Sequence, residues 1–129
     1  MILGIGIDLI EIPRIENALA RHGERFAQRI LNEREYARFK THAKPAAYLA
    51  KRFAAKEAFS KAMGTGIRTP VTWRNIGVIN HPSGRPHFDF SPELQTLLEQ
   101  RGVSRTHVSI TDEREMAAAY VILEGSAGA

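Results

Sequence analysis

The first ten residues alternate apolar and small or polar positions. Gly4, Gly6 and Asp8 occupy every second position between isoleucines and a leucine. A period of two predicts a β-strand, here with one face lined by glycines. Pro13 follows, where a first helical turn begins, and apolar residues then recur at helical spacing to about His22. The chain is therefore expected to open with a strand that leads directly into a helix.

Three further helices are predicted before the middle of the chain. Two are short, over residues 24–31 and 33–40, and Asn32 is the expected N-cap of the second. The third is long and alanine-rich, over residues 45–63, and Gly64 is its stop signal. Because its apolar positions lie all around the helix, we expect this helix to be largely buried.

The second half of the chain favours antiparallel strands. The expected elements are strands at 76–79 and 87–90 around a turn at 81–86, a helix at 92–101 closed by Gly102, and strands at 107–111 and 116–123. Helices in one half and strands in the other indicate an α+β fold. Since no linker or repeat is present, we expect one domain over residues 1–124 and a flexible C-terminal tail over residues 125–129.

Composition narrows the class of protein. The 129 residues include no cysteine, which excludes disulfide scaffolds, thiolate zinc sites and cysteine nucleophiles. The longest apolar run, Ile2 to Ile10, is too short to span a membrane and has the wrong flanks for a signal peptide. These features predict a soluble cytoplasmic protein without a membrane-spanning segment.

The net charge of +4 is unevenly distributed. Residues 1–61 carry 12 Lys and Arg against 7 Asp and Glu, whereas residues 62–129 carry 6 against 7. An anionic partner is therefore expected at the first half, either a nucleic acid, a membrane surface, a phosphorylated small molecule or an acidic protein. A nucleic-acid-binding module is the main competing class, but aromatic content is only 8% and no helix-turn-helix, zinc-finger or RNA-recognition pattern is present.

Three segments could carry chemistry, and each also has a purely structural interpretation. The glycines beside Asp8 either let a ligand or another backbone approach, or simply belong to a tightly packed strand with Asp8 as a cap. Glu57 and Lys61 are one helical turn apart, and form either an internal salt bridge or part of a site with another counter-ion. The segment 107–112 places His107 on the same face as two hydroxyl side chains, a face that lines either solvent or a polar ligand.

The combination of these segments favours a magnesium site. Asp8 and Glu57 are carboxylates on separate elements, and the chain has neither cysteines nor a histidine cluster. Magnesium is commonly held by one or two carboxylates together with water and substrate phosphates, whereas zinc prefers closely spaced His or Cys. Lys61 would then contact a phosphate rather than only Glu57.

The same segments resemble a known family over nearly the whole chain. The motifs Gly4-Ile5-Gly6-Ile7-Asp8 with Arg14, the run from Arg52 through Gly66, and His107-Val108-Ser109-Ile110-Thr111-Asp112 are similar to those of the bacterial holo-acyl-carrier-protein synthases. These are small, single-domain 4′-phosphopantetheinyl transferases of fatty acid biosynthesis. The resemblance implies an antiparallel sheet packed with a long central helix, in a homotrimer whose sites lie between subunits.

The resemblance also implies a reaction and its residues. The phosphopantetheine arm passes from coenzyme A to a serine of an apo carrier protein, and adenosine 3′,5′-bisphosphate is released. Asp8 and Glu57 would hold Mg²⁺, Glu57 would be the candidate base, and Lys61 would stabilise the leaving phosphate. The implied coenzyme A-binding residues are Lys44, Arg52, Ser60, Gly64, Gly84, Arg85, Pro86, His107, Ser109 and Thr111.

The family docks acidic carrier proteins on its first helix, which gives the basic residues there an implied role. Arg14, Arg21 and Arg25 would share one face if the helix continued past Gly23, and a solvated basic surface is the alternative. A non-catalytic adaptor that retained the fold is a further competing class. The joint presence of Asp8, Glu57 and Lys61 argues against it, because docking alone has no use for a metal site.

Overall fold

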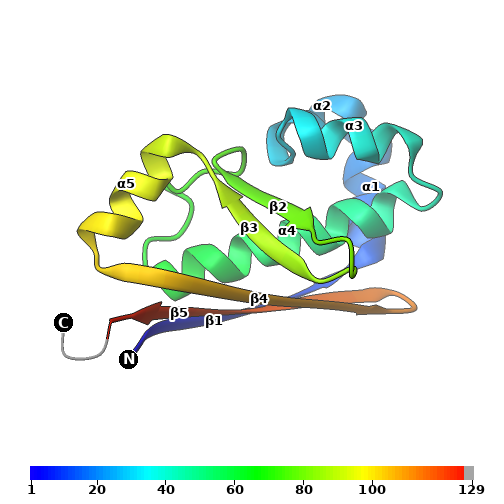
Figure 1. The fold of residues 1–129 in the computed structure, drawn as a ribbon. Helices are drawn as coiled ribbons and strands as arrows, with labels where there is room; N and C mark the ends of the chain where they lie inside the picture. Colours follow the sequence, from blue (N-terminus) through cyan, green and yellow to red (C-terminus); the bar gives the residue numbers. More distant parts are fainter. Residues whose placement is uncertain (127–129) are drawn as a thin grey trace.

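A three-stranded antiparallel sheet forms one layer of the molecule (Figure 1). The computed structural model describes residues 1–126. In the sheet, β5 (Met116–Gly125) lies between β1 (Ile2–Glu11) and β4 (Val103–Glu113). Asp8 is opposite Ala119 of β5, which in turn is opposite Ile110 of β4. The expected alternation of the first strand is confirmed, and these three residues share the inner face of the sheet.

The long helix α4 (Pro45–Met63) lies across the inner face of this sheet, and its expected bounds are confirmed. The hairpin of β2 (Ile76–Asn80) and β3 (Pro86–Phe90) covers the other side of α4 (Figure 1). Phe59 of α4 is fully buried and stacks against the aromatic rings of the hairpin. Being enclosed between two β layers explains why α4 is apolar all around.

The remaining helices close the two ends of this arrangement (Figure 1). At one end lie α1 (Ile12–His22), α2 (Glu24–Ile30) and α3 (Glu33–Thr41), and at the other lies α5 (Pro92–Gln100). The predicted cap of α3 is confirmed, because the Asn32 side chain accepts from the Glu35 backbone N–H at 2.9 Å. In return, the Glu35 carboxylate accepts from the Asn32 N–H at 2.9 Å, which completes a capping box.

The start of one strand differs most from the sequence prediction, whereas the end of the first helix at His22 agrees with it. The strand β4 begins at Val103, four residues before the expected His107, because polar residues at this exposed edge of the sheet hide the alternation. The first helix ends at Gly23, whose φ of +66° is a conformation that favours glycine and stops the helix. Arg14, Arg21 and Arg25 therefore do not lie on one face of a single continuous helix.

The expected C-terminal tail lies mostly outside the described part of the chain. Gly125 is the last residue of β5, and residues 127–129 are not described. Between residues 1 and 126, no helix combines the length and the apolar character needed to cross a membrane.

Candidate active site

Asp8 lies beside α4 because the glycines of β1 let the helix approach the strand. A Cβ added at Gly4 would clash with the carbonyl oxygen of Ala62, and one added at Gly6 would clash with that of Ala58. Only glycine permits so close a contact between a strand and a helix backbone. The glycines thus serve tight packing of the strand on a helix, which both interpretations given above for this face allow.

Lys61 connects α4 to β1 at this point. Its Nζ donates to Oδ1 of Asp8 at 3.0 Å and to the carbonyl oxygen of Ile7 at 3.2 Å. The Asp8 side chain is only 14% exposed, whereas that of Lys61 is 53% exposed. Within the described residues, the ion pair of Lys61 is thus formed with Asp8 and not with Glu57. Of the two alternatives that the sequence left open for Glu57 and Lys61, the structure supports the one in which Lys61 pairs with another charged group, here Asp8.

Glu57 completes a cluster of three charges with Asp8 and Lys61. Partial burial is the largest cause that raises the pKa of Glu57, and the negative charge of Asp8 raises it further, while Lys61 opposes both. Since Lys61 contacts Asp8 and lies one helical turn from Glu57 on α4, the two carboxylates lie on the same side of the contact between β1 and α4. The cluster combines excess negative charge with a cation at its edge.

The donor set fits a magnesium ion better than a closed metal cage. Among residues 1–126, no three His, Asp or Glu side chains gather closely enough to hold a metal by themselves. Asp8 and Glu57 supply two carboxylates whose mutual repulsion a divalent cation would relieve. Magnesium accepts such a pair and takes its other ligands from water and substrate phosphates.

Arg52 lies one helical turn and one residue before Glu57 on α4 and is only 5% exposed. Its Nη2 donates to Oδ1 of Asn80 at 2.6 Å, and its guanidinium group stacks 4.5 Å from the ring centre of Tyr48. Its Nε is buried and has no hydrogen-bond partner within the described residues. A buried arginine with an unused donor is prepared to receive a further acceptor.

A small cavity of about 90 Å³ adjoins Arg52 and is rich in positive charge. Arg34 and Arg38 of α3 line it together with Arg52. These two arginines of α3 were not among the binding residues predicted from the sequence. Their spacing of four residues does place them on one helix face, but nothing in the sequence indicated that this face would lie against β2.

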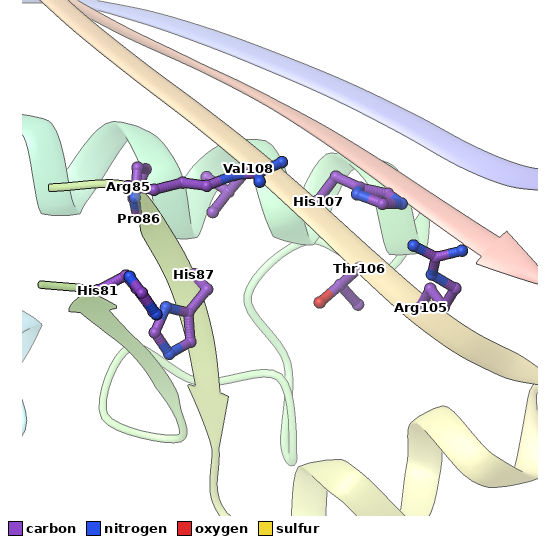
Figure 2. Close-up of a pocket in the computed structure, with 8 residues that line it drawn as sticks. All are labelled: His81, Arg85, Pro86, His87, Arg105, Thr106, His107 and Val108. Carbon is purple, nitrogen blue, oxygen red and sulfur yellow. The ribbon is translucent and has the colours of Figure 1, made fainter. Parts of the chain in front are cut away.

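A larger cavity of about 420 Å³ lies between β4 and the turn that joins β2 to β3 (Figure 2). The predicted residues Arg85, Pro86 and His107 line it, as Figure 2 shows. The sequence analysis missed the other lining residues, which are His81, His87, Arg105, Thr106 and Val108. His81 and His87 lie at the two ends of the predicted turn, but the part of β4 that faces them was not recognised as a strand.

Three predicted coenzyme-binding positions lie on or at the ends of α4. Lys44 is exposed just before the helix, and Gly64 is exposed at its end with a left-handed φ of +73°. Ser60 is 1% exposed, and its hydroxyl donates to the carbonyl oxygen of Glu57 at 2.8 Å. In the single chain, the Ser60 hydroxyl is thus bound to its own helix.

His107, Ser109 and Thr111 lie on the outer face of the sheet, opposite the inner face that carries Asp8. Their partners across β5 alternate with those of the inner face, and Ser109 is opposite Tyr120. His107 Nε2 forms a hydrogen bond with Glu124 Oε1, which is the main cause that lowers the pKa of Glu124. One chain therefore does not bring these residues to the Asp8 cluster.

The predicted docking arginines lie on two helices. Arg14 and Arg21 are exposed on α1, and Arg25 is exposed on α2 beyond the break at Gly23. A separate cavity of about 170 Å³ lined by Arg25 and Arg29 also includes Phe26. The basic surface thus follows a bent pair of helices.

Comparisons with known proteins agree with this arrangement. The family model of the 4′-phosphopantetheinyl transferase superfamily matches residues 4–121. A holo-[acyl-carrier-protein] synthase of Nitrosospira multiformis is 52% identical over 124 residues, covering 96% of this chain and 99% of its own length. One from Thiobacillus denitrificans is 53% identical over 127 residues, covering 98% and 97%.

Solved structures give the same result. The holo-[acyl-carrier-protein] synthase of Neisseria meningitidis superimposes with a TM-score of 0.94 at 47% identity, covering 96% of this chain and 99% of its own. That of Bacillus anthracis, solved in complex with CoA (3′,5′-ADP), has a TM-score of 0.81 at 41% identity, covering 98% and 99%. The chain therefore belongs to the 4′-phosphopantetheinyl transferase superfamily and, within it, to the holo-[acyl-carrier-protein] synthases.

Proposed function

We propose that this protein transfers the 4′-phosphopantetheine arm of coenzyme A to a serine hydroxyl of an apo-acyl carrier protein, within fatty acid biosynthesis. The products are the holo carrier protein and adenosine 3′,5′-bisphosphate. The observation that carries the proposal is the cluster of Asp8, Glu57 and Lys61, in which two carboxylates and one ammonium group meet between β1 and α4. Such a cluster suits a diphosphate held by a divalent cation.

Asp8 and Glu57 are the residues that would hold Mg²⁺. When bound, the ion supplies positive charge against the diphosphate oxygens, on which negative charge increases during transfer. Burial is the main cause that raises the pKa of Glu57, and the negative charge of Asp8 adds to it, so a cation bound by both carboxylates would favour their charged forms.

Glu57 and Lys61 have distinct roles in the proposed reaction. Phosphoryl transfer depends mainly on positioning and on charge stabilisation. Glu57 is the candidate base that accepts the serine proton. Lys61 is half-exposed beside Asp8, so its ammonium group is free to donate to the leaving phosphate.

Coenzyme A would bind along the basic residues that surround this cluster. The unused Nε of the buried Arg52 supports a role in binding the nucleotide end. The cavity beside Arg85, Pro86 and His107 offers further positive charge. The same role is proposed for Lys44, Ser60, Gly64, Gly84, Ser109 and Thr111, on the family resemblance.

We propose a homotrimer in which each site is completed by a neighbouring subunit. The outer sheet face carries Ile5, Ile7 and Leu9, which are 58%, 60% and 65% exposed, and Tyr120, which is 41% exposed. A contiguous apolar sheet face of this kind is typical of a surface covered by another copy. Because His107 lies on that face, the covering copy would receive it near its own cluster.

The acidic carrier protein is proposed to dock on Arg14, Arg21 and Arg25. Their exposure at one end of the molecule supports contact with an acidic partner, in which rim charges mainly accelerate encounter. We propose one transferase domain over residues 1–124 in a cytoplasmic protein, consistent with the absence of cysteine. No nucleic acid or membrane partner is part of the proposal.

The test is a mass measurement on apo-acyl carrier protein incubated with coenzyme A, MgCl₂ and this protein. The expected result is a mass gain of one phosphopantetheine group, which EDTA abolishes and added Mg²⁺ restores. Binding of the carrier without any mass gain would instead identify a non-catalytic adaptor. A mass gain that persists in EDTA would contradict the metal assignment while leaving the transfer activity intact.

A further inference from the structure

A fully buried ion pair lies beside the proposed site. Lys56 of α4 and Glu35 of α3 have side chains that are 0% and 1% exposed, and Nζ of Lys56 lies 2.6 Å from Oε1 of Glu35. Glu35 also lines the cavity of about 90 Å³ beside Arg52, which is too small to enclose coenzyme A, and Lys56 lines none of the cavities described above. Glu35 also belongs to the capping box at the start of α3.

The pair is saturated with hydrogen bonds from separate segments. Lys56 also donates to the carbonyl oxygens of Ile30, at 2.7 Å, and Trp73, at 2.9 Å, so all three of its protons are used. The second oxygen of Glu35 accepts from the backbone N–H of Val78 at 2.8 Å. The end of α2, the start of α3, the loop before β2 and β2 itself are thus attached to one point of α4.

Stability alone does not explain such a pair. Well-packed apolar residues in place of a buried ion pair are often as stable or more stable, because burying two charges is costly. The charged pair instead fixes geometry. Its five hydrogen bonds fix the rotation of α4 about its axis and the register of β2 against α4.

The rotation of α4 and the register of β2 both determine where residues of the site lie. Lys56 immediately precedes Glu57, so the rotation that holds Lys56 inward sets the direction of Glu57 toward Asp8. Arg52 is one turn before Lys56 on the same helix face, and its partner Asn80 is two residues after Val78 on β2. A shift of β2 along α4 would separate Arg52 from Asn80.

We propose that Glu35 and Lys56 form a positioning pair, which aims Glu57 at Asp8 and holds Arg52 against Asn80. The pair touches no substrate and acts only through these residues. The inference rests on the proposed transferase function, because that function gives Glu57 and Arg52 their roles.

The test compares Glu35→Gln with wild type and with the control Asp89→Asn. Glu35→Gln keeps the shape but removes the charge and replaces one of the two acceptor oxygens with an amide donor. Asp89→Asn removes a surface ion pair of α3, Arg34–Asp89, whose side chains are 71% and 55% exposed. Rates are measured per folded molecule well below the melting temperature. We expect kcat of Glu35→Gln to fall about tenfold and KM for coenzyme A to rise, with KM for the carrier unchanged within about twofold. Asp89→Asn should match wild type.

A second variant separates positioning from stability. The double variant Glu35→Gln with Lys56→Met removes both buried charges, so it should regain stability relative to Glu35→Gln but keep the low kcat. If Glu35→Gln does not fold, the double variant carries the test. Wild-type kcat and KM in a folded variant of this pair would overturn the proposal.

Calorimetric binding of coenzyme A tests the pair without transfer. The dissociation constant should rise at least about fivefold in Glu35→Gln and stay unchanged in Asp89→Asn. If wild type bound coenzyme A but transferred nothing, the proposed function would fail while this measurement still decided on the pair. Equal affinities of wild type, Glu35→Gln and the double variant would reject the positioning of Arg52.

Discussion

Lys61 binds Asp8 across the contact between α4 and β1, with Nζ 3.0 Å from Oδ1, although Glu57 is one turn away on its own helix. Lys61 therefore pairs with the carboxylate on the strand and not with Glu57, its neighbour on the helix. This leaves Glu57 half-buried and without a direct ion pair in the described residues, which agrees with its raised pKa. The ammonium group of Lys61 pairs with one of the two carboxylates, so a further cation would balance the other.

Replacing Lys61 with alanine should affect catalysis more than binding. The ammonium group stabilises charge that increases in the transition state, so kcat of Lys61→Ala should fall about 10²- to 10³-fold while KM for coenzyme A rises less. Initial rates of carrier modification measure both constants. Lys51→Ala is the matched control, since Lys51 is on the same helix and pairs with Asp112 at 3.8 Å. A larger change in KM than in kcat would make Lys61 a binding residue.

Glu57 should make the metal-free protein less stable as the pH rises. Its pKa in the folded chain lies above its ordinary value, so the folded state holds this proton more tightly than the unfolded state. Stability is therefore lost as the pH rises from about 4.5 through the raised pKa. In EDTA at pH 7.5, Glu57→Gln should melt at a higher temperature than wild type, and the two should converge below about pH 4, where Glu57 is protonated.

Magnesium should reverse the order of the melting temperatures of wild type and Glu57→Gln. Adding MgCl₂ at pH 7.5 should raise the melting temperature of wild type, because the ion binds the folded state, and should barely change that of Glu57→Gln. Glu16→Gln, a change at an exposed glutamate of α1, is the control and should respond as wild type does. An equal magnesium response in wild type and Glu57→Gln would remove Glu57 from the metal site.

The sequence predicted the elements of the site better than the contacts between them. The bounds of α4, the strand of Asp8 and the cap at Asn32 follow from local periodicity and turn chemistry, and the structure confirms them. The buried pair of Glu35 and Lys56 joins residues 21 positions apart, and no local pattern reveals such a contact. Glu35 satisfied the capping pattern, which concealed its second role.

The edge strand β4 shows a different limit. Its first residues are polar on the exposed face, so the alternation that identifies a half-buried strand begins only at His107. Missing those residues also hid the wall that Arg105 and Thr106 form in the larger cavity. Cavities arise where separate elements meet, so periodicity within one element does not predict them.

Gly6→Ala should destabilise the protein and displace Asp8. The added Cβ would clash with the carbonyl oxygen of Ala58, and backbone atoms of a buried helix move only at a cost, typically about 1–3 kcal/mol for overpacking. Urea unfolding measures the loss. Gly64→Ala is the control, because that glycine is in the left-handed helical conformation with open space around it, so its cost is only backbone strain of about 1–2 kcal/mol. If Gly6→Ala were less destabilising than Gly64→Ala, the close contact would be wrong.

Arg14→Glu should weaken binding of the carrier protein without affecting binding of coenzyme A. Reversing a charge on the exposed side of α1 should raise KM for the carrier by about tenfold at low salt and flatten its dependence on ionic strength. KM for coenzyme A should not change, since Arg14 lies far along the chain from Arg52 and Lys61 and lines none of the described cavities near them. An unchanged KM and salt dependence for the carrier would identify Arg14 as a solvated surface residue.

Mixing two inactive variants tests whether neighbouring subunits share a site. If Asp8 of one subunit works with His107 of the next, co-expressed Asp8→Ala and His107→Ala chains form some interfaces in which both native residues meet. With random assembly, about a quarter of the sites would be intact, so activity should return toward about a quarter of wild type. Ile7→Asp, placed in both chains, should abolish this recovery, because it buries a charge in the apolar sheet face, where Ile7 is now 60% exposed. Size-exclusion chromatography with light scattering should then show monomers. Activity of the mixture no higher than the mean of the two variants would place each complete site within one chain.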